Sequence, residues 1–293
     1  MTEALCGKEF TGNSVFYDVF ASEERQKAVR EARPYQLAIE LLSKCYGSCA
    51  YCYASSVESS QPILPTDRVF GLIDEAKEIG IEMIYWYGGE PTLHPAWVSL
   101  ANYATEKGIA NVMVLSGLIP QKLAKQLCSI ETTGAVIHID SVVPEAYNQV
   151  HTNPKTLQAK MQGYRNLLDA GYPPEKVMGC MTVTRPILST LEQTFAYFLD
   201  EMGASHIIFA AFQGAGFGDE RRHWEPSRTE LEQAYKYRAQ RLRDPNLLRT
   251  GISDASKFFC KGYLGVTYNG EVLPCLVVRD LVAGNIFEES LTE

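Results

Sequence analysis

Three cysteines lie within eight residues of one another and offer the most distinctive chemistry in this sequence. Cys45, Cys49 and Cys52 have the spacing C-x3-C-x2-C, and no cysteine or histidine follows at short range. A closed structural zinc site needs four protein ligands. Thiolates are soft ligands that favour iron–sulfur centres. Three thiolates on a cubane cluster leave one iron without a protein ligand, so the spacing predicts a cluster to which a small molecule can bind.

A second motif, Gly88-Gly89-Glu90-Pro91, directly follows the apolar run Met83–Tyr87. Two adjacent glycines allow the backbone to approach a ligand closely, because no side chain stands in the way. By itself the motif is also typical of an ordinary turn at the end of a strand. Its position about forty residues after the cysteines favours a ligand site.

Together the two motifs resemble the signature of radical S-adenosylmethionine (SAM) enzymes, including the aromatic residue Tyr51 before the last cysteine. The resemblance implies that Cys45, Cys49 and Cys52 hold a [4Fe–4S] cluster whose open iron binds SAM. It also implies that the Gly88–Glu90 segment binds the amino group of SAM. In this family the reduced cluster passes one electron to SAM, and the resulting 5′-deoxyadenosyl radical takes a hydrogen atom from the substrate.

Further candidate contacts with SAM lie at the ends of predicted strands. Ser116 and Ser141 carry hydroxyl groups suited to the ribose or carboxylate, and Thr182 ends another strand beside Arg185. An arginine pairs with a carboxylate through charge-assisted hydrogen bonds. Each of these residues, taken alone, is equally typical of a strand-end cap, so we assign them to SAM only as a set.

Two further residues are candidates for the chemical step. Cys180 has the same strand parity as Thr182, so both side chains are expected on one face of the sheet. An interior thiol can return a hydrogen atom to a substrate radical, as in the family's epimerases; the alternative is a buried core cysteine. His138 is a candidate acid–base or substrate contact.

A second pair of cysteines lies near the C-terminus. Cys260 and Cys275 read as C-x9-G-x4-C through Gly270, which resembles the opening of the SPASM or shortened twitch extension of radical SAM enzymes. That resemblance implies an auxiliary iron–sulfur cluster, although no cysteine follows Cys275 to complete the pattern. The alternative is a hairpin whose two thiols pack as small hydrophobic groups.

The elements that must position these residues alternate between strand and helix patterns. This alternation predicts parallel strands joined by right-handed crossovers, and six units agree with the partial (β/α)6 barrel that the resemblance implies. Asn269-Gly270 predicts a small C-terminal β-hairpin. The expected strands are 35–42, 83–87, 111–115, 135–140, 177–184 and 206–212, and the expected helices are 67–79, 95–107, 120–127, 155–170 and 190–202.

Length and composition set the broad class. The 293 residues are 46% hydrophobic and 21% charged, which is ordinary for a globular protein. We expect a lead over residues 1–33, the barrel over 34–225 and a helix with the extension over 226–293. No apolar run is long enough to span a membrane, and no secretory signal is evident. Clustered thiols then indicate a reducing compartment, the cytoplasm. The net charge of −8 argues against nucleic acid as a partner.

The resemblance implies an enzyme that abstracts a hydrogen atom from a small organic substrate, such as an aminosugar or cyclitol, in a biosynthetic dehydrogenation, epimerisation or rearrangement. It also implies an electron donor such as flavodoxin or ferredoxin. The alternative within the family is a maturase of a ribosomal peptide, against which we count the short stretch before the first strand. An alternative of another class is a non-catalytic zinc or iron–sulfur binding module.

Overall fold

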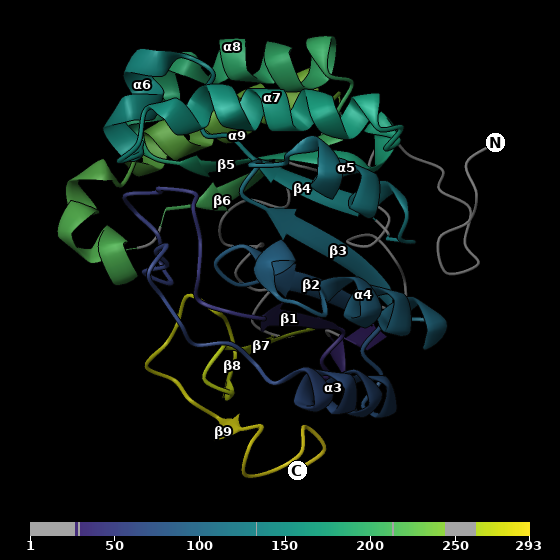
Figure 1. The fold of residues 1–293 in the computed structure, drawn as a ribbon. Coiled ribbons are helices and arrows are strands. Elements are labelled where there is room, and N and C mark those ends of the chain that lie inside the picture. Colours follow the sequence, from purple (N-terminus) through teal and green to yellow (C-terminus); the bar gives the residue numbers. More distant parts are fainter. Residues whose placement is uncertain (1–26, 29, 133, 213, 244–261) are drawn as a thin grey trace.

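A single mixed sheet forms the centre of the computed structural model, which describes residues 27–28, 30–132, 134–212, 214–243 and 262–293. Within these residues nine strands stand in the order β6-β5-β4-β3-β2-β1-β7-β8-β9 (Figure 1). Their bounds are β1 Gln36–Glu40, β2 Met83–Tyr87, β3 Ala110–Leu115, β4 Gly134–His138, β5 Val177–Val183, β6 His206–Ala211, β7 Tyr263–Val266, β8 Glu271–Leu273 and β9 Gly284–Asn285.

The first six strands are parallel, and each pairs with the next one along the chain. All six therefore end at the same edge of the sheet, where functional groups of parallel α/β folds gather. Among the described strands β1 and β6 do not pair, so the sheet is open. The α/β fold and the predicted partial barrel of six strand–helix units are confirmed.

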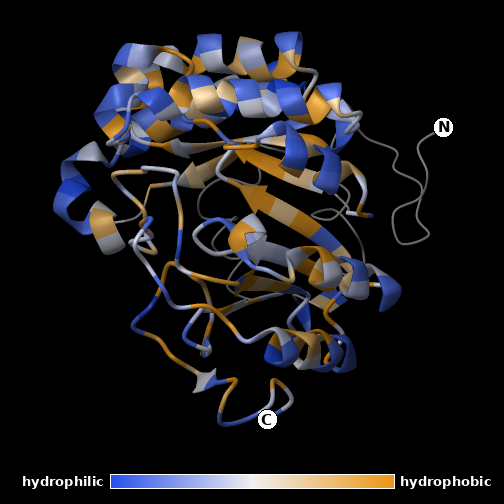
Figure 2. Ribbon diagram, in the orientation of Figure 1, coloured by the Kyte–Doolittle hydropathy of each residue, from blue (hydrophilic) through white to orange (hydrophobic). Residues whose placement is uncertain are grey.

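Helices cover one face of this sheet, as Figure 1 shows. Helix α3 illustrates why, because it buries Val69, Leu72, Ile73 and Ala76, an amphipathic stripe. Hydropathy colouring shows the same alternation along the other helices over largely apolar strands (Figure 2). The remaining bounds are α3 Thr66–Glu78, η1 Pro91–Leu93, α4 Trp97–Glu106, α5 Gln121–Cys128, α6 Pro144–Val150, α7 Lys155–Asp169, η2 Pro174–Lys176, η3 Arg185–Thr190, α8 Leu191–Phe195, η4 Ala196–Glu201, η5 Gly216–Trp224 and α9 Arg228–Arg241.

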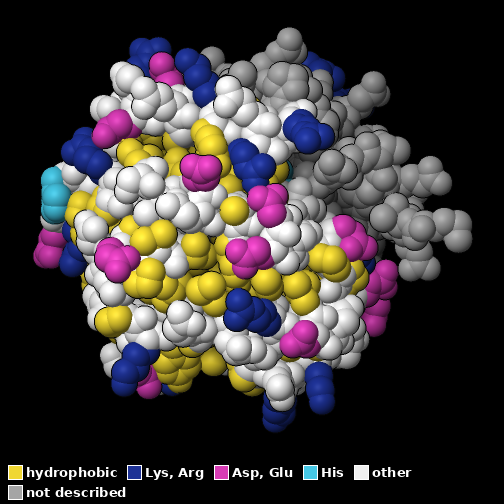
Figure 3. All heavy atoms as spheres, turned by 90° about the horizontal axis from the view of Figure 1, so that it is seen from above, with side chains coloured by type: hydrophobic (Ala, Val, Ile, Leu, Met, Phe, Trp, Pro, Cys, Tyr) yellow, Lys and Arg dark blue, Asp and Glu magenta, His cyan; other side chains and the backbone are white. Residues whose placement is uncertain are grey.

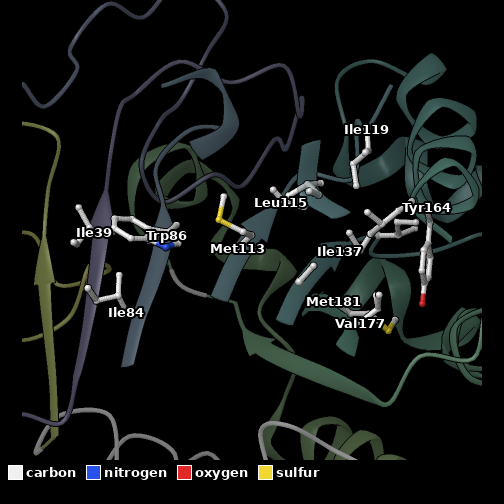
Figure 4. Packing of buried hydrophobic residues seen from close by; sticks show 14 of the residues in the cluster. Ile39, Ile84, Trp86, Met113, Leu115, Ile119, Ile137, Tyr164, Val177 and Met181 are labelled. Atoms are coloured by element: carbon white, nitrogen blue, oxygen red, sulfur yellow. The ribbon is translucent and has the colours of Figure 1, made fainter. Parts of the chain in front are cut away.

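Alternate residues of each strand face two different environments. Ile39 and Trp86 point into the large core under the helices, which Figure 4 shows from close by. Ala38 and Tyr85, one position away, belong to a smaller cluster on the other face, and Cys180 packs against that cluster. The parity argument thus placed Cys180 correctly on the face opposite the helices.

The predicted C-terminal hairpin is present as β7 and β8, joined by a turn in which Gly270 has φ +84°. A positive φ at this position favours glycine. The sequence did not predict that β7 would continue the main sheet, pairing in parallel with β1. Nearby, the buried carboxylate of Glu40 at the end of β1 forms an ion pair with Arg279. This ion pair ties the C-terminal segment to the edge that carries the cysteines.

Two helix predictions need correction. The segment 190–202 is not one α-helix, because it consists of the end of η3, the short α8 and the π-helical η4. Helix α6 was not predicted at all, since its seven residues are too short for a clear apolar period.

On the side of α7 and α8, hydrophobic side chains form a band across the surface, and charged groups of both signs are scattered around it (Figure 3). Across the described part of the chain, no helix combines the length and the apolar character needed to cross a membrane.

Candidate active site

The cysteine loop, which we define as residues 43–52, begins just beyond β1 and is held on one side by the loop after β2. The N–H groups of Gly89 and Glu90 donate to the carbonyls of Leu42 and Lys44, at 2.6 and 2.8 Å. A Cβ atom on Gly89 would lie only 2.0 Å from the Lys44 carbonyl oxygen. These glycines therefore permit a close approach to the cysteine loop itself. Their contact with SAM stays a prediction.

This packing makes Gly89 a sensitive position. In a Gly89→Ala variant the new methyl group collides with the backbone at Lys44, and overpacking of this kind costs about 1–3 kcal/mol. We expect the cysteine loop to move away and the reconstituted protein to lose most of its bound iron. Iron and sulfide analysis checks this result. The matched control is Gly71→Ala, where only the end of the Arg68 side chain lies nearby; equal iron in the two variants would contradict the prediction.

The chain that follows α6 holds the other side of the cysteine loop. Cys49 and His151 form an isolated antiparallel bridge. On either side of it the Ala50 N–H donates to the Val150 carbonyl, and the Thr152 N–H to the Ser48 carbonyl, both at 2.9 Å. The loop is thus clamped between segments that follow β2 and β4, which fixes its backbone without any metal.

Two of the three sulfurs face the same small volume. A Cβ atom placed on Gly47 would lie 3.2 Å from Cys45 Sγ and 3.8 Å from Cys49 Sγ. The Gly47 N–H also donates to Cys45 Sγ at 3.2 Å, a contact of the kind that tunes iron–sulfur centres. Within the described residues no three His, Cys, Asp or Glu side chains are grouped closely enough to hold a single metal ion. Thiolates are the ligands that iron–sulfur clusters take in proteins, so this donor set fits the cluster.

The thiols differ in their electrostatic surroundings. Burial, together with the Glu90 carboxylate and the neighbouring thiols, raises the pKa of Cys45 to about 12. Burial also opposes ionisation of Cys49, but His151 and Lys160 outweigh it and hold the pKa of that thiol well below its usual range. Metal ligands must be deprotonated, and the surroundings of Cys49 favour its thiolate form.

Behind Cys49 lies a buried hydrogen-bonded network centred on Asp140, two residues beyond the end of β4. One carboxylate oxygen accepts from Tyr51 Oη at 2.5 Å and lies 2.7 Å from His151 Nε2; the other accepts from the Thr182 N–H at 2.8 Å and lies 3.0 Å from His138 Nε2. Although burial opposes its charge, the two imidazoles hold the pKa of Asp140 well below its usual range. Burial lowers the pKa of His138, but Asp140 outweighs it and raises that pKa to about 9. The network joins three predicted site residues, namely Tyr51, His138 and Thr182.

The structure also brings Glu90 and Ser116 together. One Glu90 oxygen accepts from the Ser116 N–H and hydroxyl, at 2.9 and 2.6 Å, and the other accepts from the Thr92 hydroxyl at 2.8 Å. Glu90 is therefore held rigidly at the shared edge of β2 and β3. It lines a cavity of about 340 Å³ whose other lining residues are Tyr46, Thr92, Leu93, Ser116, Leu118, Pro120, Lys122, Leu123 and Gln126.

Two candidates have partners elsewhere. The Ser141 hydroxyl is buried and bonds Thr190 Oγ1 at 2.8 Å, so it stabilises the turn before α6. The Arg185 guanidinium donates to the carbonyls of His223 and Glu225, at 3.1 and 2.8 Å. These hydrogen bonds connect Ser141 and Arg185 to other elements of the fold. We therefore do not include either residue in the proposed SAM site.

Of the second pair of cysteines, Cys260 lies outside the described residues. Cys275 is half-buried, and its thiol adds to the effect of burial, which raises the pKa of the Tyr87 and Tyr263 phenols. Tyr87, Tyr263 and Cys180 pack against the cluster on the sheet face opposite the helices. An auxiliary cluster at Cys260 and Cys275 and a hydrogen-donor role for Cys180 stay predictions.

Sequence reasoning missed two residues of the site, His151 and Lys160. His151 lies in no recognisable motif, and only α6, itself not predicted, brings it back to the cysteine loop. Lys160 did carry a signal, because Leu157, Lys160 and Tyr164 have helical spacing on the buried face of α7. A lysine on an apolar helix face is unusual and marks a position worth inspecting.

With this geometry established, comparison with known proteins identifies the class. The family model described as the radical SAM superfamily matches residues 39–197, more than half of the chain, and this chain belongs to that superfamily. A second model, described as an iron–sulfur cluster-binding domain (SPASM), matches residues 258–293. The predictions of a radical SAM enzyme with a SPASM-like extension are confirmed, and the alternative of a non-catalytic module is set aside.

The sequence identity to individual relatives is low. The chain is 27% identical to the AdoMet-dependent heme synthase of Methanosarcina barkeri, covering 89% of this chain and 81% of that protein. It is 25% identical to the PqqA peptide cyclase of Gluconobacter oxydans, covering 89% and 76%. Among solved structures, Streptococcus suis SuiB bound to its precursor peptide SuiA aligns with a TM-score of 0.71 at 15% identity, over 99% of this chain and 71% of that one. This last likeness concerns the fold.

The cofactors follow from the family. Radical SAM enzymes use a [4Fe–4S] cluster and SAM, and the SPASM match supports an auxiliary iron–sulfur cluster in addition. Both cofactor predictions are thereby confirmed at the level of the family.

Proposed function

We propose that this protein is a radical SAM enzyme that modifies a peptide. The observation that carries the proposal is the clamped loop of Cys45, Cys49 and Cys52 at the carboxyl edge of the parallel sheet, in a chain with named peptide-modifying relatives. The mycofactocin maturase MftC of Mycobacterium ulcerans, 27% identical over 173 residues, is another. We had placed a small organic substrate first; these relatives favour the peptide alternative.

In this proposal Cys45, Cys49 and Cys52 hold the [4Fe–4S] cluster, and the segment Gly88–Glu90 with Ser116 forms the wall against which the amino group of SAM binds. Once bound, these cofactors supply one-electron cleavage of SAM and abstraction of a hydrogen atom from the substrate. The chain contributes rigidity, since the loop and Glu90 are already held by internal hydrogen bonds. The electron comes from a reduced carrier such as flavodoxin or ferredoxin.

A second candidate substrate is a tetrapyrrole. The relatives that favour it are the heme synthase already described and the Fe-coproporphyrin III synthase of Methanosarcina barkeri, which is 27% identical over 202 residues. A porphyrin is a rigid aromatic disc, whereas a peptide is an extended polar chain, so the two candidates are easily distinguished by experiment.

The test is substrate-dependent formation of 5′-deoxyadenosine by the anaerobically reconstituted, dithionite-reduced protein. One set of reactions receives synthetic peptides from short reading frames that neighbour the gene, and the other receives iron coproporphyrin III. We expect a peptide to raise the rate about tenfold over SAM alone, with a new mass for that peptide. Stimulation by the porphyrin alone would replace the peptide proposal with the tetrapyrrole one.

A further inference from the structure

Lys160, on helix α7, is a buried charge that the described contacts do not satisfy. Its side chain has no exposed surface, and its Nζ atom has no hydrogen-bond partner among the described residues. The centroid of the Tyr147 ring lies 5.6 Å from Nζ. Burying an unpaired ammonium is costly in free energy unless a negative charge stands close by. The position therefore calls for negative charge close to the ammonium.

The packing of α7 fixes where this ammonium lies. Gly163 allows the helix to touch the turn after β3, because a Cβ atom there would lie 2.1 Å from the Gly117 carbonyl oxygen. Gly117, with φ +91°, receives the aliphatic stem of Lys160 within 3.2 Å of where its own Cβ would be. The aliphatic stem of Lys160 packs against the turn at Gly117, which keeps the ammonium inside the protein.

Helix α7 places Lys160 close to the cysteine loop. Thr156, one turn before Lys160, bonds the Ser48 hydroxyl at 3.1 Å. The charged or ionisable groups near the ammonium are Cys49, Tyr147, Asp140 and Cys45. Both oxygens of Asp140 are already engaged by Tyr51, Thr182 and two imidazoles. The Lys160 charge therefore acts on the sulfurs of the cysteine loop and on whatever they bind.

We propose that the Lys160 ammonium is a positioning charge that raises the reduction potential of the cluster held by Cys45, Cys49 and Cys52. The cluster becomes more negative by one unit when it accepts an electron. A fixed positive charge behind the cysteine loop favours that reduced form, and net charge is one of the levers that set such potentials. The proposal rests on these cysteines being the ligands and does not depend on the class of substrate.

The test is a redox titration followed by electron paramagnetic resonance, on reconstituted protein without SAM or substrate. The signal of this cluster is assigned by its absence from Cys45→Ala/Cys49→Ala/Cys52→Ala. We expect Lys160→Met to shift the reduction equilibrium about tenfold against the reduced form, about 59 mV for one electron. Lys160→Arg keeps the positive charge and should stay close to the wild-type potential. Lys155→Met, at an exposed position of the same helix, is the matched control and should not shift.

Lys160→Met is expected to fold, since replacing a buried ion with an apolar side chain is often neutral or stabilising. If it folds but fails to assemble the cluster, Lys160→Gln is titrated in its place. A Lys160→Met or Lys160→Gln protein that holds wild-type iron and titrates at the wild-type potential would overturn the proposal. Weakened SAM binding at that unchanged potential would instead assign the ammonium to the carboxylate of SAM.

Discussion

Replacing all three cysteines of the loop, as Cys45→Ala/Cys49→Ala/Cys52→Ala, should abolish SAM cleavage completely. The thiolates act as one unit, so removal of the set leaves no site for the open iron, and the chemistry of the cofactor is lost with it. Fold should survive in the variant, because the cysteine loop is held by backbone hydrogen bonds to residues 88–90 and 150–152. The measurement is 5′-deoxyadenosine formation together with iron and sulfide content.

Cys128→Ala is the matched control for this variant, since that thiol is exposed and lies far along the chain at the end of α5. It should keep wild-type cleavage and iron. Iron that remains on the triple variant would establish a second cluster, as the SPASM match leads us to expect. SAM cleavage that survives in the triple variant would disprove the assignment of the three cysteines.

Removal of the Asp140 carboxylate is expected to have the largest effect on stability. Asp140→Ala leaves two buried imidazoles and the Tyr51 hydroxyl without their shared partner, and breaking a buried ion pair in this way costs about 3–5 kcal/mol. The cysteine loop should loosen as well, because His151 reaches from Asp140 to the Gly47 carbonyl. Urea unfolding of the apoprotein checks the change in free energy.

The ion pair of Asp140 with His138 also predicts how the free energy of unfolding changes with pH. The pKa of Asp140 is depressed in the folded protein, so its contribution is lost as pH falls below about 4, the unfolded value. The pKa of His138 is raised to about 9, so its contribution is present below about 6.5 and is lost as pH rises toward 9. Asp140→Asn should weaken the dependence of the free energy of unfolding on pH in both ranges. Asp169→Asn, a change at an exposed position, should leave that dependence unchanged. If the free energy of unfolding depends on pH in the same way in the wild type and in Asp140→Asn, the stabilising role of the Asp140 network is contradicted.

Much of this arrangement could be predicted from local sequence patterns. The parallel direction of six strands followed from the alternation of strand and helix patterns, and the family resemblance implied their arrangement as a partial barrel. The placement of Cys45 directly beyond β1 followed from the end of the first apolar run. Glu90 and Ser116 were both predicted at strand ends, and neighbouring parallel strands bring their ends together. Patterns of this kind depend on residues close in sequence, which is why they can be read without the structure.

The remaining features depend on contacts between distant segments. Lys160 and Gly117 are far apart in the chain, and only the close packing of α7 on the turn after β3 places the ammonium behind Cys49. The packing of Gly89 against the Lys44 carbonyl could not be predicted for the same reason, because Lys44 and Gly89 are far apart in the chain. Likewise the hairpin was predicted, but its parallel pairing with β1 was not.

In the proposed function these three thiolates leave one iron free to bind SAM. Electron–nuclear double resonance on the reduced cluster, with SAM isotopically labelled at its amino nitrogen, shows whether SAM binds there. We expect a hyperfine coupling from the label in the wild-type protein, and the same coupling in Cys275→Ala. A reduced cluster that is present at full occupancy and shows no coupling to the label would contradict the account.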